Sequence, residues 1–258
     1  MGAMRTIARN VASNALGYLV SLVLAIVVTP LALETLEEAQ YGIWVAIVSL
    51  TGYYGILDLG IRSAVAQYVT RSWASKDLLG LSRTLSTALA ITSVVAVILA
   101  LVSVALALIS DHLFGYAAGT HEGLWRAILV FGIGAAVSFP LAVFGAVIQA
   151  RERFDLANIT GITERVVTNA LYVWVLTTGH GILALAWVTT GVALLAHLVR
   201  IVIALRLIPG VEFRLRHVDR QTLRKLFGFG VFSFLVSISD RLVLYTDTVV
   251  ILLVLNET

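Results

Sequence analysis

Charged and polar side chains lie inside long apolar runs of this sequence at four places, and they are its candidate functional residues. At one of them, Asp58 and Arg62 stand at i and i+4 with the acid first, the better order for an ion pair on a helix. A charge inside a membrane costs about 3 kcal/mol or more, so each one needs a partner, a water-filled cavity or the interface. Two interpretations stay open: the pair satisfies itself near the membrane surface, or it lines a cavity.

Two further runs carry charges of both signs. Glu164 and Arg165 are adjacent, so they point about 100° apart on a helix, and at least one should face the protein interior or the interface. The last apolar run contains Asp240, Arg241 and Asp247. A helix that served only as an anchor would not carry these charges, which favours a hydrated cavity or a further partner helix.

The remaining polar positions are more ordinary. Asn14 belongs to a stripe with Asn10, Gly17 and Ser21 that favours helix packing, with substrate contact at Asn14 as the alternative. Among the histidines only His197 falls in mid-span, and it is interpreted as a packed polar group rather than a proton relay. No metal-binding spacing such as H-E-x-x-H occurs.

Several classes of chemistry are excluded by the motifs that the sequence lacks. Cysteine is absent, which rules out disulfides, thiolate metal sites and a cysteine nucleophile. No Walker loop, G-x-S-x-G or G-x-G-x-x-G motif occurs. Any transport by this chain is therefore not driven by its own ATP hydrolysis.

The elements that must position these residues are membrane helices. The chain is 59% hydrophobic and 13% charged, with a mean hydropathy of +0.96, and a soluble fold of 258 residues could not bury so much apolar surface. A spanning helix needs about 20 mostly apolar residues. The pattern predicts an all-α transmembrane helix bundle of about seven spans, at Val11–Leu33, Gly42–Ile61, Leu85–Ile109, Leu124–Ala150, Gly161–Thr178, Ile182–Leu205 and Leu226–Leu255.

Positive charge alternates strongly between the connections. The first and fifth connections have no Lys or Arg, and the third has only Arg126. By the positive-inside rule, the N-terminus and the even-numbered loops face the cytoplasm, and Thr258 lies outside. The N-terminus and the second, fourth and sixth connections hold nearly all of the 18 Lys and Arg, namely Arg5, Arg9; Arg62, Arg71, Lys76, Arg83; Arg151, Arg153, Arg165; and Arg200, Arg206, Arg214, Arg216, Arg220, Arg224, Lys225.

Three further features concern a helix kink, a basic segment and the last span. Pro140 lies in mid-span and should kink the fourth helix. Segment Arg214–Lys225 is either a short helix on the inner leaflet, with Leu215, Val218, Leu223 and Leu226 toward lipid, or a solvated basic linker. The last span ends three residues before the end of the sequence, so we expect a fragment of a longer transporter.

Four stretches resemble the oligosaccharide flippases, the O-antigen and polysaccharide exporters of the multidrug/oligosaccharidyl-lipid/polysaccharide superfamily. The most specific is Y-G-I-W-V-A-I-V-S-L-T-G-Y-Y-G-I-L-D-L-G-I-R-S-A-V-A-Q-Y-V, from Tyr41 to Val69. The others are R-N-V-A-S-N-A-L-G-Y from Arg9, F-G-A-V-I-Q-A-R-E-R-F-D-L-A-N from Phe144, and S-D-R-L-V-L-Y-T-D-T-V-V-I from Ser239. They follow one another at the expected helices, and the resemblance covers the whole chain.

The resemblance implies an architecture of two six-helix lobes around a central cavity that opens alternately to each side. Residues 1–210 would form the N-terminal six-helix lobe, 211–225 a cytoplasmic basic linker, and 226–258 the first helix of a second lobe. The chain is short for this family, so it is expected either to be truncated or to work as an oligomer, and truncation is favoured.

The resemblance also implies a function. The chain would be a multi-pass protein of the bacterial inner membrane that flips a polyprenyl-pyrophosphate-linked oligosaccharide to the outer leaflet, and not an enzyme. Its partners would be this lipid-linked oligosaccharide, membrane lipids and other polysaccharide-assembly proteins, without nucleic acid. It would need no cofactor, with coupling to a proton or a sodium gradient left open. Arg62, Arg165 and Arg241 would attract the pyrophosphate, and Asp58, Glu164 and Asp240 would hold them or exchange ions.

Three alternatives belong to other classes. An ion-coupled multidrug antiporter of the same superfamily would prefer acidic cavity residues over arginines. A membrane glycosyltransferase or polymerase would need a large soluble domain or a long outer loop, and every outer loop here is short. A non-transporting seven-helix bundle fits the number of spans but does not explain the intramembrane charges.

Overall fold

The described part of the chain is mostly helical. The computed structural model describes residues 17, 19–20, 22–24, 26–36, 41, 44–45, 60–113 and 122–236, and no strand occurs among them. A first helix is seen in pieces between residues 17 and 35, and a last one covers 220–236. Between them lie α3 (Ile61–Ala74), α4 (Leu78–Leu113), α5 (Glu122–Ala150), α6 (Phe154–Thr177), α7 (Ile182–Leu207) and the single 3₁₀ turn η1 (Leu215–His217).

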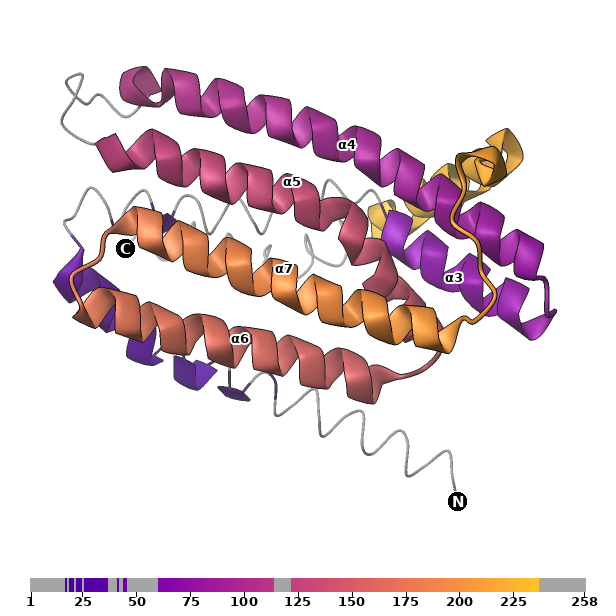
Figure 1. Cartoon of the computed structure of the whole chain (residues 1–258), viewed down its shortest axis with the longest axis horizontal. Helices are drawn as coiled ribbons and strands as arrows, with labels where there is room; N and C mark the ends of the chain where they lie inside the picture. The colour runs from indigo at the N-terminus through magenta and orange to yellow at the C-terminus, as the bar shows by residue number, and fades with distance from the viewer. Residues whose placement is uncertain are drawn as a thin grey trace, which may run out of the picture.

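Four long helices run side by side in the order α4, α5, α7, α6 (Figure 1). α5 packs extensively on both α4 and α7, and α6 packs mainly on α7. The shorter α3 lies beside α4 and α5 at one end of the bundle. This arrangement confirms the predicted all-α bundle, and it places α7 between α5 and α6, where its side chains meet both neighbours.

Three of the described helices are long and apolar enough to cross a membrane, namely Leu78–Ser110, Trp125–Ala150 and Ile182–Leu207. α6 was predicted as a span from Gly161, but it begins seven residues earlier, at Phe154. It has the length of a span without the apolarity of one, because polar side chains occupy its first half. These polar groups need partners from the neighbouring helices.

Two glycines of α5 bring its neighbours close. A Cβ added to Gly132 would overlap Ser103 of α4, and one added to Gly134 would overlap Thr190 of α7. Residues two apart point about 200° apart on a helix, so these two glycines face opposite neighbours. Small residues at such contacts allow close helix packing in membranes. Thr190 then donates its hydroxyl to the carbonyl of Val130 (3.1 Å).

α5 is bent in the half that contains Pro140 (Figure 1). Proline lacks an N–H and its ring clashes with the preceding turn, which explains a bend at this point. The bend agrees with the kink predicted from the sequence.

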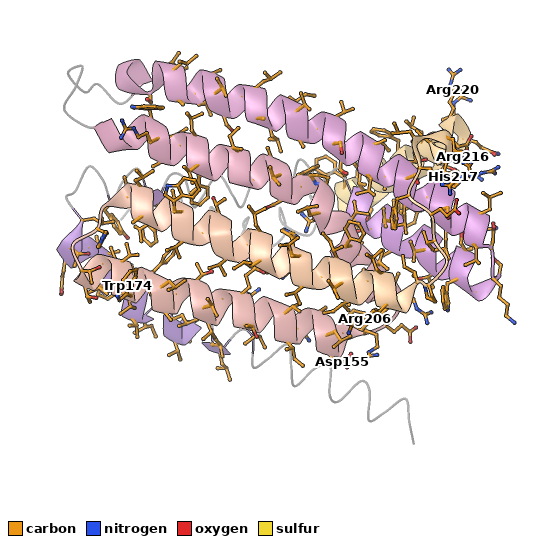
Figure 2. All side chains as sticks on the ribbon, viewed as in Figure 1. Asp155, Trp174, Arg206, Arg216, His217 and Arg220 are labelled. Atoms are coloured by element: carbon orange, nitrogen blue, oxygen red, sulfur yellow. The ribbon has the colours of Figure 1, made fainter. Side chains whose placement is uncertain are left out.

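One end of the bundle carries most of the charge. Asp155, Arg206, Arg216, His217 and Arg220 lie there, whereas Trp174 marks the other end (Figure 2). We call it the basic end: the C-terminal ends of α3, α5 and α7, the N-terminal ends of α4 and α6, and the segment 208–225. The described residues of the opposite end include Arg126, whose guanidinium lies 5.3 Å from the Trp125 ring.

The sequence prediction missed α3 altogether. It assigned Arg62–Thr84 to a loop and began the next span at Leu85, but α3 ends at Ala74 and α4 begins at Leu78. Lys76 has a left-handed φ of 55° in the turn between them, and Asp77 accepts the Gly80 N–H (2.8 Å) to start α4. The helices are therefore extended beyond the apolar runs by capping, which hydropathy does not report.

The basic segment after α7 combines features of the two predicted forms, because it is largely exposed and irregular through residue 219 and helical from residue 220. Through residue 219 it contains only the short turn η1, and its backbone is bound to α4. The N–H groups of Glu212, Arg214 and Asp219 donate to Ser82, Ser86 and Thr87, at 3.1, 3.3 and 3.2 Å. All three hydroxyl residues are buried. Leu215 is 87% exposed as expected, but Leu226 is fully buried.

We expect the double variant Ser86→Ala/Thr87→Ala to loosen this segment. Each lost neutral hydrogen bond is worth about 1 kcal/mol, so amide exchange over 211–219 should speed up about tenfold or more. Hydrogen exchange with mass spectrometry measures this directly. Ser75→Ala is the matched control, because that hydroxyl bonds only within its own helix. Equal amide exchange in the double variant and in the control would contradict the binding of segment 211–219 to α4.

Candidate functional site

An ion pair joins α6 to α7 in the half of the bundle nearer the basic end. Arg200 donates from Nη2 to Glu164 Oε2 at 2.5 Å, and the two side chains are only 18% and 26% exposed. Glu164 lies ten residues into α6 and Arg200 seven residues before the end of α7. At 1.5 Å per residue these are about 15 and 11 Å from the basic ends of their helices.

Arg165 makes a different contact on the same helix. Its Nη1 donates to the carbonyl of Gly17 at 3.5 Å, so it reaches the first helix while Glu164 reaches α7. Gly17 is buried, and its Cα faces Ile162 and Arg165 of α6. The two adjacent charges thus point to different neighbours, as their sequence spacing predicts. Glu164 is partly buried against α7, whereas Arg165 is exposed.

His197 lies one turn before Arg200 on α7, about 15 Å from the basic end. Its Nδ1 is buried without a hydrogen-bond partner. The charges of both Arg200 and Arg62 act on this ring, which brings α3 into the same cluster. A buried polar atom without a partner is uncommon in folded proteins and needs an explanation. His197 therefore belongs to the candidate site, whereas the sequence analysis interpreted it as a packed polar group.

Arg62 comes from the start of α3, directly after a sharp break in the backbone. Gly60 has φ 71° and ψ 12°, the left-handed conformation, and α3 begins at Ile61. A Cβ on Gly60 would overlap the carbonyl oxygen of Gly230 in helix 220–236. α3 therefore begins against helix 220–236, and Arg62 is placed about 18 Å from the end of α3.

We call Arg62, Glu164, His197 and Arg200 the central cluster, and Arg165 lies beside it on α6 but reaches the first helix. The cluster combines two guanidinium groups, one carboxylate and one imidazole from α3, α6 and α7. Guanidinium presents several N–H donors in a planar fork that matches phosphate oxygens. Such a set suits an anionic ligand better than a cation. No group of three or more His, Cys, Asp or Glu that could hold a metal occurs within the described ranges.

Of the eight residues proposed from the sequence, the structure places Arg62 and Glu164 in this cluster and Arg165 next to Glu164, in contact with the first helix. The sequence analysis paired Asp58 with Arg62 on the assumption of one continuous helix, but the backbone at Gly60 is left-handed and not helical. The other five lie outside the described residues, namely Asn14, Asp58, Asp240, Arg241 and Asp247.

Arg200 is the residue that the sequence analysis missed. It was counted among the loop charges, together with Arg206, but both lie within α7. A signal was present, because the apolar run Ile201–Leu205 follows Arg200 before the next charge. An arginine flanked by apolar residues on both sides belongs to the helix rather than to its end, and it therefore needs a partner.

Comparison with known proteins gives one finding. The sequence model of a family described as polysaccharide biosynthesis protein matches residues 7–258. No curated protein and no solved structure matches the chain.

Proposed function

This chain belongs to the polysaccharide biosynthesis protein family, and from that premise we propose that it flips a lipid-linked oligosaccharide across the membrane. The substrate would be an oligosaccharide on polyprenyl pyrophosphate, moved from the cytoplasmic to the outer leaflet for cell-surface polysaccharide assembly. The protein would lie in the bacterial inner membrane with its basic end on the cytoplasmic side, in accordance with the positive-inside rule. The proposal includes no chemical step on the substrate and no cofactor.

The observation that carries this proposal is the central cluster. Arginines are costly inside a bundle that crosses a membrane, and they are kept where a ligand or a partner needs them. Pyrophosphate is the anionic part of the proposed substrate, and two arginines from separate helices, Arg62 and Arg200, both act on the region around His197. The sugar and the polyprenyl chain offer no comparable charge. The pyrophosphate is therefore the group that this cluster would recognise.

The ion pair between Glu164 and Arg200 has a defined part in this mechanism. It fixes the guanidinium of Arg200 between α6 and α7 and ties the two helices together. An anion that reached the cluster would compete with Glu164 for Arg200. The released carboxylate, with the unpartnered nitrogen of His197, would be the place where a coupling proton or sodium ion could act. Alternating access would then follow from the change in helix pairing.

Binding of polyprenyl pyrophosphate to the purified protein tests the recognition step. Arg62→Gln is expected to weaken binding about tenfold or more, because a charge-assisted hydrogen bond is worth about 1.5–3 kcal/mol. The matched control is Arg206→Gln, an exposed arginine in the last turn of α7 and outside the cluster. Unchanged affinity in Arg62→Gln, with folded protein, would remove Arg62 from the site.

A further inference from the structure

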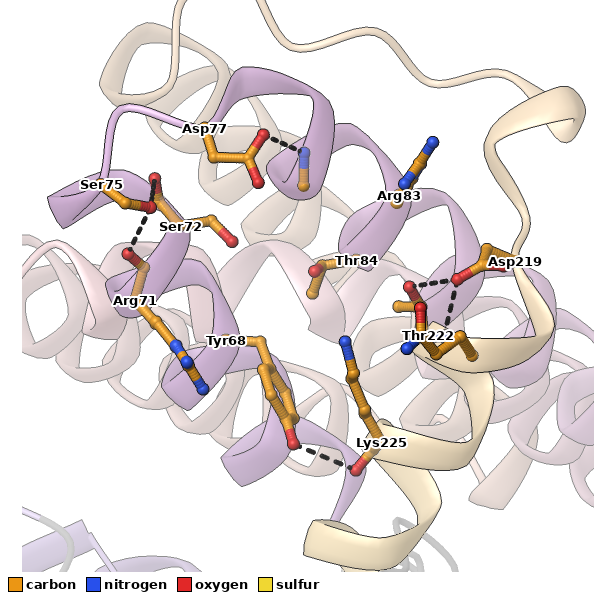
Figure 3. Close-up of a pocket in the computed structure, with 12 residues that line it drawn as sticks. Tyr68, Arg71, Ser72, Ser75, Asp77, Arg83, Thr84, Asp219, Thr222 and Lys225 are labelled. Atoms are coloured by element: carbon orange, nitrogen blue, oxygen red, sulfur yellow. Dashed lines mark hydrogen bonds between the residues drawn. The ribbon is translucent and has the colours of Figure 1, made fainter.

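A second basic site lies at the surface of the basic end, apart from the central cluster. A pocket of about 340 Å³ opens between the C-terminal half of α3, the start of α4 and the start of helix 220–236 (Figure 3). Its lining contains three cations, Arg71, Arg83 and Lys225, each from a different one of these helices. Five residues with hydroxyl groups also line the pocket, namely Tyr68, Ser72, Ser75, Thr84 and Thr222.

The two carboxylates of the pocket are already engaged. Asp77 Oδ1 accepts the N–H of Gly80 (2.8 Å). Asp219 Oδ2 accepts the N–H and the hydroxyl of Thr222, at 2.8 and 2.9 Å. These bonds hold the pKa of Asp219 below its usual value. The bond from the Thr222 N–H has the largest effect, the bond from the Thr222 hydroxyl comes next, and the charge of Arg83 contributes less. Both acids thus act as helix caps.

The cations are available to a ligand. No ion pair shorter than 4.0 Å involves Arg71, Arg83 or Lys225 in the part of the chain that the structure describes. Lys225 extends from its helix into the space beside Tyr68 and Thr84 (Figure 3). The Tyr68 hydroxyl donates to the backbone carbonyl of Lys225 (3.5 Å), and the Tyr68 ring packs on Phe229 with ring centroids 6.3 Å apart. The helix that carries Lys225 is therefore fixed against α3 without use of its ammonium group.

The depth of the pocket indicates the kind of ligand. The apolar span of α4 runs from Leu78 to Ser110, 33 residues, whereas about 20 are enough to cross the hydrocarbon core. Ser82, Ser86 and Thr87, which bind the segment 211–219, lie in the first three turns of α4. With the surplus length of α4 at the basic end, the pocket would lie at the level of the lipid headgroups. Clusters of Lys and Arg at this level attract anionic lipids.

We propose that this pocket binds a phosphate group through Arg71, Arg83 and Lys225, and that the phosphate is that of an anionic phospholipid. The hydroxyl groups of Ser72 and Thr84 add donors for the phosphate oxygens. A phosphate held there would tie helix 220–236 to α3 and α4, in addition to the contact between Gly60 and Gly230. This site is separate from the one proposed for transport and does not depend on it.

The test uses the purified protein and two probes, short-chain phosphatidylglycerol and inorganic phosphate. The double variant Arg71→Gln/Lys225→Gln should bind phosphatidylglycerol about tenfold or more weakly, since each cation near a lipid surface contributes about 1 kcal/mol. Arg224→Gln is the matched control, because it removes a charge from the same helix outside the pocket lining. Its affinity should change less than twofold.

The two probes separate the sources of the phosphate. If phosphatidylglycerol binds and millimolar inorganic phosphate does not displace it, the bound phosphate is that of a lipid headgroup, as proposed. Equally tight binding of inorganic phosphate would overturn the lipid and leave a site for free phosphate. Affinity unchanged in the double variant, or lowered as much in Arg224→Gln, would overturn the site itself.

Discussion

Gly60→Ala is expected to lower the free energy of unfolding by about 2–5 kcal/mol and to reduce the yield of folded protein. Two costs add at this position. The left-handed φ of 71° costs roughly 1–2 kcal/mol for a residue with a Cβ. The new methyl group would also overlap the carbonyl oxygen of Gly230, which is backbone and cannot rotate away. Overpacking of this kind costs about 1–3 kcal/mol.

Thermal unfolding of the purified protein, followed by loss of the monodisperse peak on size exclusion, measures this effect. Gly228→Ala is the matched control, since it lies on the same helix as Gly230 and a Cβ there meets no atom within 4 Å. That variant should unfold close to the temperature of the unmodified protein. A Gly60→Ala protein as stable as Gly228→Ala would show that α3 and helix 220–236 do not meet as described.

The second large effect is expected at the ion pair between α6 and α7. Glu164→Ala removes the partner of Arg200, whose side chain is only 18% exposed, and should cost about 3 kcal/mol. The charge-exchanged double variant Glu164→Arg/Arg200→Glu should recover part of this loss, because the two groups keep opposite signs. A double-mutant cycle on thermal stability then gives the coupling between the two positions.

The exposed pair Glu212–Arg214 provides the comparison. Its side chains are about half exposed, at 49% and 50%, so Glu212→Gln should change stability by less than about 1 kcal/mol. An equal effect at the two pairs, or additive single and double variants at Glu164 and Arg200, would mean that the buried pair does not join the helices.

The long apolar helices could be predicted from the sequence because their lengths and hydropathy are set by the membrane. The described spans α4, α5 and α7 contain the predicted ones, and α7 begins at the predicted Ile182. α3 could not be found in this way, because Arg62, Gln67 and Arg71 make it too polar. What holds it in place is packing by fully buried residues such as Val65 and Val69. That packing exists only once α4 and α5 have assembled.

The site was predictable only in part for a related reason. Charges inside apolar runs mark Arg62, Glu164 and Arg165 as unusual, but nothing in the sequence says which helices meet. The partner of Glu164 is 36 residues away on α7, and the contact of Arg165 is 148 residues away at Gly17. The break at Gly60 could not be recognised either, since it depends on the approach of Gly230. Contacts between helices, rather than patterns within them, form the central cluster.

The most direct test of transport is a leaflet assay in liposomes. The protein would be reconstituted with an oligosaccharide on polyprenyl pyrophosphate, or with the same oligosaccharide on an uncharged polyprenyl carrier. The fraction exposed to an external glycosidase would be followed over time, with an ion gradient applied. We predict faster exposure of the pyrophosphate-linked form than in protein-free liposomes, and no such gain for the uncharged form. Exposure of the pyrophosphate-linked form no faster than in protein-free liposomes, from folded protein, would contradict the proposed flipping.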